Sequence, residues 1–270
     1  MKYKHTFLFS IITVCFNEEK SIRKTIESVL NQSFSDYEYI ICDGGSTDNT
    51  LKIVESYQDA FKKKGIRYLI HSEKDSGIYF GMNIGVALST GKYLNFMNAA
   101  DAFHAPTVLQ EAASYLQSGD VDILYGDVLR VIRHYSSLDV GRISLVEKRM
   151  PFCHQAMFIK QELLRQHPYD TTYRIAADYE FVLAMWAQKK KFTRADIIVA
   201  NFSFDGISST QREQLVEEDA AIALKYDLPF DYAARLKTAQ KNCRHDKLRE
   251  QCPEWLWNFW NWTRGKKRVD

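Results

Sequence analysis

Short apolar runs alternate with stretches of helical periodicity through the first half of this 270-residue chain. Runs rich in β-branched and aromatic residues, such as Phe7–Phe16, are typical of buried strands, whereas Ile22, Ile26 and Val29 recur at helical spacing. A strand–helix–strand order needs a crossover connection, which places the strands parallel and is right-handed in nearly all proteins. The alternation therefore predicts an α/β fold with a mostly parallel, Rossmann-like sheet flanked by helices.

The same pattern gives the expected bounds of the elements. Strands are predicted at 7–16, 37–42, 66–70, 92–97, 122–125, 154–159 and 192–201, and helices at 17–30, 47–63, 77–89, 105–117 and 178–188. Asn17 is expected to be the N-cap of the first of these helices. Residues 128–133 and 142–146 are expected to form a polar hairpin or excursion, and the chain from Thr210 onward is helical in character. We expect one catalytic domain over residues 1–208 and a helical C-terminal extension over 209–270.

The bulk composition excludes several classes of protein. Lys and Arg number 36 against 34 Asp and Glu, so the chain has no general attraction to nucleic acid. The five cysteines are odd in number and form no C-x-x-C pair, which favours a reducing compartment over a disulfide framework. No signal peptide and no run long enough to cross a bilayer is evident, so a cytoplasmic protein is expected.

Two of the predicted strands are followed by an acid. Asp43 comes directly after the second strand and precedes Gly44-Gly45, and Asp101 lies in a loop of small residues after the fourth. Because ligands of open α/β sheets bind at the carboxyl ends of the strands, the two acids suggest one site for a nucleotide and a cation. The alternatives are a turn acid at Asp43 and a helix N-cap at Asp101.

The first strand-to-helix turn excludes two common nucleotide sites. It reads Cys15-Phe16-Asn17-Glu18-Glu19 and has no glycine, whereas a dinucleotide fold needs the G-x-G-x-x-G turn for its pyrophosphate. No Walker A sequence is present either. Nicotinamide and P-loop chemistry are therefore poor fits.

Six blocks of sequence follow one another in a recognisable order. They are Ser10–Asn17, Asp43–Asp48, Asp75–Tyr79 with Met82-Asn83, Met97–Asp101, Cys153–Gln155 and Ala177–Glu180. Together they resemble family 2 glycosyltransferases of the GT-A fold. The resemblance covers residues 8 to 210, and its subgroup builds bacterial surface polysaccharides. It implies a nucleotide-sugar half up to about residue 127 and an acceptor half over 128–208.

The resemblance implies a set of donor contacts. Thr13 and Val14 would line the nucleotide pocket, and Asp43 would contact the base. Asp75 would lie near the nucleotide, and its loop leads into Gly77 to Asn83, close to the donor sugar. The donor is then a nucleoside-diphosphate sugar, with uridine as the expected base.

The resemblance also implies the metal ligand and the base. Asp101 matches the last acid of the D-x-D-type motif and would bind Mn²⁺ or Mg²⁺, which stabilises the departing diphosphate. Asp178 matches the general base that deprotonates the acceptor hydroxyl, and Glu180 is the alternative base. One carboxylate acting through the acceptor predicts inversion at the anomeric carbon.

Three more polar residues are candidates for acceptor or phosphate contacts. His154 and Gln155 could hydrogen-bond the acceptor or the diphosphate, although a buried structural histidine is the alternative for His154. Arg174 could pair with phosphate or orient Asp178, and a surface ion pair is its alternative.

The chain departs from the family pattern in three places. Asn98-Ala99-Ala100 precedes Asp101 where relatives carry a further acid or a Ser/Gly pair, so a metal held there should bind weakly. Phe80-Gly81 replaces the usual Asp-Ala and affects donor-sugar contacts. Ala177 replaces the acid before the base.

The C-terminal end combines aromatic and basic residues. Five aromatics between Trp255 and Trp262 are followed by Arg264, Lys266, Lys267 and Arg268. Such a segment favours the interface of an anionic membrane, so peripheral contact with the inner face and a saccharide or lipid-linked saccharide acceptor are expected. The alternative is an aromatic helix that closes the catalytic core.

Two other functions compete with the glycosyltransferase. A sugar nucleotidyltransferase would usually carry a glycine-rich basic loop after the first strand, where this chain is acidic. A non-catalytic nucleotide-sugar-binding or scaffold subunit would explain the sparse motif before Asp101, although the retention of Asp101 and Asp178 disfavours it.

Overall fold

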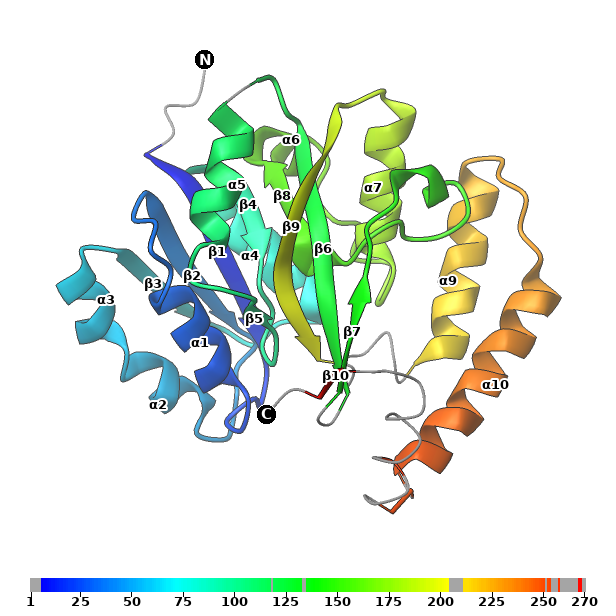
Figure 1. Cartoon of the computed structure of the whole chain (residues 1–270), viewed down its shortest axis with the longest axis horizontal. Coiled ribbons are helices and arrows are strands. Elements are labelled where there is room, and N and C mark those ends of the chain that lie inside the picture. The colour runs from blue at the N-terminus through cyan, green and yellow to red at the C-terminus, as the bar shows by residue number, and fades with distance from the viewer. Residues whose placement is uncertain are drawn as a thin grey trace.

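A computed structural model describes residues 6–117, 119–132, 135–203, 211–250, 252–253, 257 and 267–268. Over these residues the chain forms one mixed, curled sheet with helices on both faces (Figure 1). The strand order is β10-β7-β6-β8-β4-β1-β2-β3, and β9 pairs with β6 and β5. The α/β prediction with helices on both faces is confirmed.

The first half of the sheet is parallel, as predicted. β1 (Phe7–Cys15) is central and lies between β2 (Tyr37–Asp43) and β4 (Gly91–Phe96), and β3 (Arg67–Ser72) forms the edge. The register pairs Cys15 with Asp43 and Ile12 with Phe96. The carboxyl ends of β2 and β4 therefore flank the end of β1.

The second half of the sheet is mixed. β8 (Met157–Lys160) is antiparallel to both β4 and β6 (Ile123–Ile132), whereas β9 (Phe192–Ser203) is parallel to β6. β5 (Ala102–Phe103) is a short antiparallel partner of β9. "Mostly parallel" thus describes only the nucleotide-binding half that the sequence predicts.

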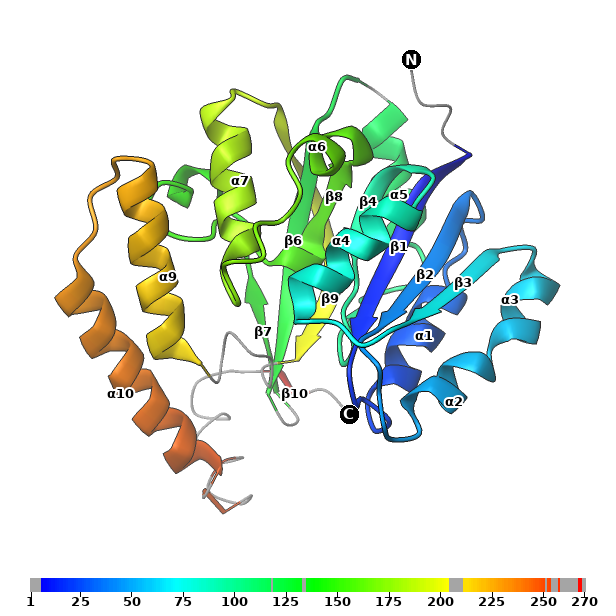
Figure 2. The same cartoon turned by 180° about the vertical axis from the view of Figure 1, so that it is seen from behind.

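Helices cover both faces of this sheet. On one face lie α1 (Ile22–Leu30) and α5 (Val108–Gln117), and on the opposite face lie α4, α6 and α7 (Figures 1 and 2). The bounds of the remaining helices are α2 (Thr50–Glu55), α3 (Gln58–Lys64), α4 (Ile78–Leu88), α6 (Gln161–Gln166), α7 (Ala177–Ala187), α9 (Arg212–Lys225) and α10 (Tyr232–Glu250).

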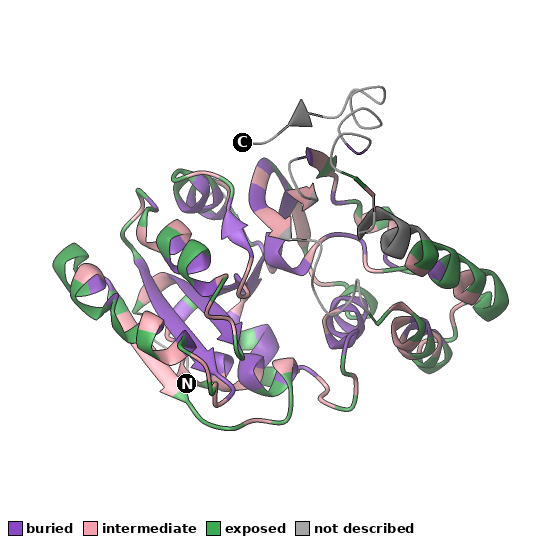
Figure 3. Ribbon diagram, turned by 90° about the horizontal axis from the view of Figure 1, so that it is seen from below, coloured by how far each residue is buried: buried purple, intermediate pink, exposed green. Residues whose placement is uncertain are grey.

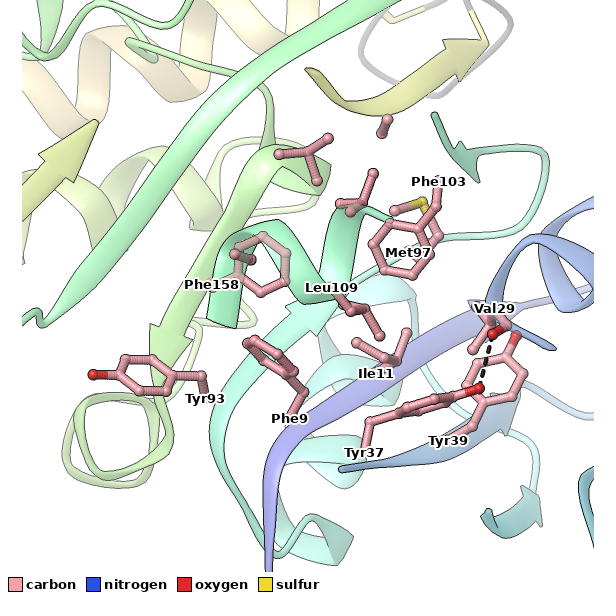
Figure 4. Close-up of a cluster of buried hydrophobic side chains, with 14 of the residues drawn as sticks. Phe9, Ile11, Val29, Tyr37, Tyr39, Tyr93, Met97, Phe103, Leu109 and Phe158 are labelled. Carbon is pink, nitrogen blue, oxygen red and sulfur yellow. Dashed lines mark hydrogen bonds between the residues drawn. The ribbon is translucent and has the colours of Figure 1, made fainter. Parts of the chain in front are cut away.

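The two faces of the sheet bury two separate apolar cores. Phe9 and Ile11 of β1 point to the α1/α5 side, where Leu109 and Phe158 join them, and the Tyr37 hydroxyl donates to the Val29 carbonyl oxygen at 2.8 Å (Figure 4). Alternate residues of β1 pack on the other side under α4 and α7. The burial map shows the central strands buried and the outer surfaces of the helices exposed (Figure 3). A fully buried strand explains the near-continuous apolar run in this part of the sequence.

Several predicted elements differ in detail. The helix expected over 47–63 is broken into α2 and α3 near Ser56 and Tyr57, and α6 was not predicted. β6 continues through residues expected to leave the sheet, and its hairpin partner is β7 (Tyr135–Asp139) rather than 142–146. Residues 143–145 form a 3₁₀ turn instead.

The C-terminal extension packs onto the catalytic domain. α9 and α10 lie against each other beside α7 (Figures 1 and 2). The predicted boundary at residue 208 falls outside the described residues, as does most of the aromatic segment, and the domain division stays a prediction. Of that segment Trp257 is buried, and β10 (Lys267–Arg268) pairs antiparallel with β7. Among the described helices, none is both long and apolar enough to traverse a bilayer.

Candidate functional site

The site forms where the parallel strands end. The Gly44 amide donates to the Cys15 carbonyl oxygen at 2.9 Å, and the Ala99 amide donates to the Val14 carbonyl oxygen at 3.3 Å. The loops after β2 and β4 therefore meet on either side of β1. Because neighbouring strands lie about 4.8 Å apart and β1 lies between β2 and β4, the ends of β2 and β4 are separated by roughly 10 Å, which is two interstrand spacings.

Hydrogen bonds tie the loop after β1 to the loop after β2. The Asn17 side-chain oxygen accepts from the Thr47 amide at 2.8 Å, and the Asn17 amide donates to the Ser46 hydroxyl at 2.8 Å. Asn17 has a positive φ of 55°, and α1 starts only at Ile22. Its predicted role as the N-cap of that helix is therefore wrong, because its side chain binds the neighbouring loop instead.

Asp43 is buried inside this loop pair. Its carboxylate accepts from the Ser46 amide at 3.1 Å, from the Ser72 hydroxyl at 2.6 Å and from the Ser46 hydroxyl. These contacts give Asp43 the turn role that the sequence left open. The Cys15 thiol, at 3.8 Å, is a fourth donor to a carboxylate that has about four lone-pair positions. Contact of Asp43 with a base would therefore have to displace one of these donors, and it stays a prediction.

Asp75 lies against the loop after β2. Its carboxylate accepts from the Gly77 amide at 3.0 Å, and its oxygens would lie 3.2 and 3.3 Å from a β-carbon at Gly44. Gly77 has φ 138° at the start of α4, a conformation that favours glycine. Burial and then the charge of Asp75 raise the pKa of Cys42 to about 12. Asp75 and Asp43 thus belong to one acidic corner at the end of β2.

Glycine at position 81 is explained by the end of β1. A β-carbon at Gly81 would overlap the Val14 side chain and approach Asp75 Oδ2 at 3.2 Å. The departure from the family's usual alanine therefore lets α4 lie directly on β1. Val14 itself is buried on that side of the sheet.

Thr13 and Asn83 were predicted to contact the nucleotide-sugar donor, but their side chains bind other residues of the chain. The Thr13 hydroxyl is completely buried, donates to the Met97 carbonyl oxygen at 2.6 Å and lies 2.8 Å from the Tyr39 hydroxyl. The Asn83 amide binds both backbone groups of Tyr169, at 2.9 and 3.0 Å. In this structure both side chains hold the site's framework together, and a direct contact with the donor stays a prediction for them.

Asp101 is held by the next cluster of residues along the site. Its Oδ2 accepts from the Gln155 side-chain amide at 2.5 Å, while Gln155 Oε1 accepts from the Cys153 thiol at 2.8 Å. The nearby Asn98 Oδ1 is buried and has no hydrogen-bond partner in the structure. Ala100 between them has φ 75°, which is costly for a residue with a β-carbon.

This oxygen set fits a weakly held divalent cation. Mg²⁺ is usually bound by one or two carboxylates, with substrate phosphates and waters completing the shell. The Asp101 carboxylate supplies one such ligand, and Asn98 Oδ1 is an unsatisfied oxygen beside it in the sequence. Within the described part of the chain, no three His, Cys, Asp or Glu residues are placed so that they could hold a metal ion together, so an ion here would need further ligands such as substrate phosphates and waters.

Asp178 lies at the start of α7 and reaches across to α4. Its Oδ1 accepts from the Tyr79 hydroxyl at 3.0 Å and from the Tyr179 amide at 2.9 Å. The Tyr79 hydroxyl also lies 2.7 Å from the Ile175 carbonyl oxygen. Burial and then the charge of Asp178 raise the pKa of Tyr79 well above its usual value, so the phenol stays protonated.

His154 joins the two halves of the site. Its Nε2 lies 2.8 Å from the Tyr169 hydroxyl, and its ring stacks on Phe96 with centroids 5.1 Å apart. Burial lowers the pKa of His154, and the charge of Asp178 partly opposes this effect. The structural role is therefore the one seen. The Tyr169 ring packs in turn on that of Tyr79, which binds Asp178, and the adjacent Gln155 binds Asp101. These contacts connect the two acids.

The two remaining candidates lie outside the cluster. Glu180 is completely buried and accepts from Lys225 at 2.8 Å and from Tyr226 at 2.7 Å, both at the end of α9. It faces away from Asp178, as expected for a residue two positions along a helix. Arg174 is exposed, and its backbone amide donates to Glu218 at 3.0 Å. Contact of its side chain with phosphate stays a prediction.

Sequence reasoning missed three contributors. Tyr79 lies inside a recognised block, yet nothing in its spacing indicates contact with Asp178 across 99 positions. Tyr169 and Glu218 lie in stretches without a motif. Only the folded chain brings them to α7.

Comparison with known proteins shows the family to which this chain belongs. The family model described as glycosyl transferase family 2 matches residues 10–178. A PGL/p-HBAD biosynthesis glycosyltransferase of Mycobacterium tuberculosis is 33% identical over 210 residues, covering 75% of this chain and 80% of its own.

Solved structures share the fold at lower identity. Residues 1–349 of S. aureus TarS in complex with UDP superpose with a TM-score of 0.65 at 18% identity, covering 84% of this chain and 68% of that one. A mannosyltransferase from Pyrobaculum calidifontis in complex with GDP-Man and Mn²⁺ gives a TM-score of 0.65 at 16% identity, covering 88% and 74%.

Proposed function

Because this chain belongs to glycosyl transferase family 2 and has the GT-A fold, we propose that it transfers a sugar from a nucleoside-diphosphate sugar to a hydroxyl group. We propose a UDP-sugar as donor, a saccharide or lipid-linked saccharide as acceptor, and a role in cell-surface polysaccharide biosynthesis. The two structural neighbours with bound nucleotides carry UDP and GDP-Man, which supports a nucleotide-sugar donor.

One observation supports the proposal most directly. The carboxylates of Asp101 and Asp178 are linked by a chain of contacts. Gln155 binds Asp101, and the adjacent His154 lies 2.8 Å from the Tyr169 hydroxyl. The Tyr169 ring packs on that of Tyr79, whose hydroxyl binds Asp178. A transfer reaction needs a cation at the departing diphosphate, which Asp101 would hold, and a base at the acceptor, and this pair is suited to both tasks.

The residues divide the reaction between them. Asp178 accepts the proton of the acceptor hydroxyl while that oxygen forms a bond to the anomeric carbon. The bond from this carbon to the diphosphate oxygen breaks, and the diphosphate departs with the electron pair. A single displacement of this kind inverts the anomeric configuration. General base catalysis by a positioned carboxylate contributes about 10²- to 10⁴-fold.

The remaining groups orient the reactants. The Tyr79 hydroxyl fixes Asp178 Oδ1 and leaves the other oxygen to accept the proton. Gln155 orients Asp101, which with Asn98 would hold Mn²⁺ or Mg²⁺. When bound, such an ion would neutralise charge on the diphosphate. Asp43, Asp75 and the turn at Gly77 form the donor side of the site.

The alternatives from the sequence are less consistent with these findings. Membership in a glycosyltransferase family disfavours a sugar nucleotidyltransferase. A scaffold subunit would not need Tyr79 and Gln155 to hold two acids in register. Membrane contact through the C-terminal segment stays a prediction, testable by flotation with anionic vesicles of the full chain and a chain ending at Cys252. Equal binding of the two would contradict it.

A thermal-shift screen tests the donor class. UDP, GDP, UDP-GlcNAc and GDP-mannose are added to the full chain with and without MnCl₂. A ligand at 100 times its Kd should stabilise the fold by about 2.7 kcal/mol. We expect the largest shift from a uridine nucleotide with Mn²⁺. The matching UDP-sugar should then donate its sugar to p-nitrophenyl glycosides in a transfer assay. The absence of a shift with every nucleotide would contradict the proposal.

A further inference from the structure

A carboxylate from the C-terminal extension binds the backbone just before α7. Glu218 Oε1 accepts from the Arg174 amide at 3.0 Å, and Glu218 Oε2 accepts from the amides of Ile175 and Ala176 at 2.8 and 2.9 Å. Three consecutive amides thus converge on one side chain of α9. Hydrogen bonds to an ionised acceptor are roughly twice as strong as neutral ones, so this contact fixes the turn firmly.

The 174–176 turn has no side chain of its own that caps the start of α7. Ala176 occupies the N-cap position of α7, where alanine offers no side-chain acceptor, and no capping bond from this residue is formed. The direction in which α7 leaves the turn is therefore set from outside. Asp178 is the second residue of that helix, so its position follows the turn directly.

The same peptide segment is held from its opposite side by α4. The Ile175 carbonyl oxygen lies 2.7 Å from the Tyr79 hydroxyl, which is also 3.0 Å from Asp178 Oδ1. Glu218 binds the amide of Ile175 and Tyr79 binds its carbonyl oxygen. Moving the turn away from Glu218 would consequently shift the Tyr79 hydroxyl relative to the Asp178 carboxylate.

α9 is a fixed support for this contact. Lys225 and Tyr226 at its end bind the buried Glu180 of α7, and Ile222 is fully buried against the core. Gln214, one turn before Glu218, donates to its Oε1 at 3.2 Å. These contacts fix the position of Glu218 relative to α7.

We propose that Glu218 is a positioning residue for the base: it acts through the 174–176 turn to aim the Asp178 carboxylate at the acceptor hydroxyl. This inference rests on the proposed role of Asp178. It makes the C-terminal extension part of the transfer apparatus, although the family match ends at Asp178. A displacement of about 1 Å at a reacting group can lower a rate about 10²-fold, so one lost anchor is sufficient for a large effect.

A double-mutant cycle tests the proposal. Glu218→Gln keeps the shape of the side chain and removes its charge and one acceptor. In the full chain we expect kcat to fall about 10- to 100-fold, while the KM for the donor stays unchanged within about 2-fold. The donor is UDP-GlcNAc or GDP-mannose, whichever gives the larger thermal shift. The same change added to Asp178→Asn should lower the residual rate by less than about 2-fold, because residues acting through one another are not additive.

A neighbouring acid supplies the control. Glu217 lies on the same helix and is exposed, so Glu217→Gln should leave kcat unchanged. Melting temperatures of all variants are measured, and rates are referred to the folded fraction. Glu218→Gln is used rather than Glu218→Ala, because alanine would leave three backbone amides without their acceptor.

Each outcome separates this inference from the proposed function. Equal losses in both backgrounds would show a general structural role and overturn the positioning role, as would a wild-type kcat for Glu218→Gln. If Asp178→Asn itself kept normal turnover, the assignment of the base would be wrong. A loss with Asp178→Asn but none with Glu218→Gln would remove the positioning role alone.

Discussion

Asp178 and Glu180 lie on the same helix, but their substitution should have opposite effects: a change at Asp178 should lower activity and a change at Glu180 should lower stability. Asp178 is partly exposed at the site, and both of its hydrogen bonds are accepted by Oδ1. In Asp178→Asn the amide oxygen can accept both bonds, so we expect the free energy of unfolding to change by less than about 1 kcal/mol. The amide cannot accept the acceptor's proton. The loss in kcat should be about 10²- to 10⁴-fold, or about 3 to 5 kcal/mol of transition-state stabilisation.

Glu180→Gln is the matched change two residues later. Burial alone would raise the pKa of Glu180, but hydrogen bonds from Lys225, Tyr226 and His167 more than offset it and hold the pKa below its usual value. The ionised form therefore stabilises the fold at neutral pH, and this contribution is lost as pH falls through the lowered pKa. We expect Glu180→Gln to lower the free energy of unfolding at pH 7 by about 2 kcal/mol.

Urea unfolding and steady-state kinetics on both variants decide the matter. The reasoning requires a crossed result, in which Asp178→Asn is stable and inactive while Glu180→Gln is destabilised and active once the folded fraction is counted. If Glu180→Gln were the inactive, stable variant, the roles assigned to the two carboxylates would be refuted. Binding of UDP should be unchanged in both, because the hydrogen bonds of the two acids do not involve Asp43 or Asp75 on the donor side.

Three further changes test other parts of the structure. Gln155→Leu removes the donor to Asp101 and should raise the Mn²⁺ concentration needed for half-maximal activity about 10-fold or more, whereas an unchanged metal titration would count against Asp101 as a ligand. Burial raises the pKa of Asp219 from 3.8 to about 6, so the folded chain holds a proton that the unfolded chain has released. The free energy of unfolding should then fall as pH rises from about 4 to 6, and Asp219→Asn should flatten that slope in urea titrations. Gly81→Ala should destabilise the chain by about 1 to 3 kcal/mol, and adding Val14→Ala should restore most of it; additive losses would contradict the overlap.

The parallel half of the fold was predictable because its signals are local. Strands buried on both faces leave continuous apolar runs; Asp43 is the last residue of one such strand, and Asp101 lies in the loop after another. The strand order then brings both loops to β1 without further information. The placement of Asp178 beside them depended on the family resemblance, since 77 residues separate it from Asp101 in the sequence (178 less 101).

The remaining features depend on contacts that leave no periodic signal. The tight packing of α4 on β1 reads as a departure from the family at Gly81 until Val14 is seen against it. Asparagine is a common helix-capping residue, but Asn17 has a positive φ and its side chain binds the Thr47 amide, so it connects two loops instead. Glu218 lies 40 residues after Asp178, and only the packing of α9 on α7 brings it to the turn.

The Glu180 cluster bears on how small a working fragment of this enzyme can be made. Cutting the chain before α9 would remove Lys225 and Tyr226 and leave His167 as the remaining partner of the Glu180 carboxylate among those described. Water would have to reach the Glu180 carboxylate, or the carboxylate would have to take up a proton, and either event would weaken the packing of α7. A shortened gene product that stops at the end of β9 should consequently express as an insoluble or molten species, even though it contains every family motif.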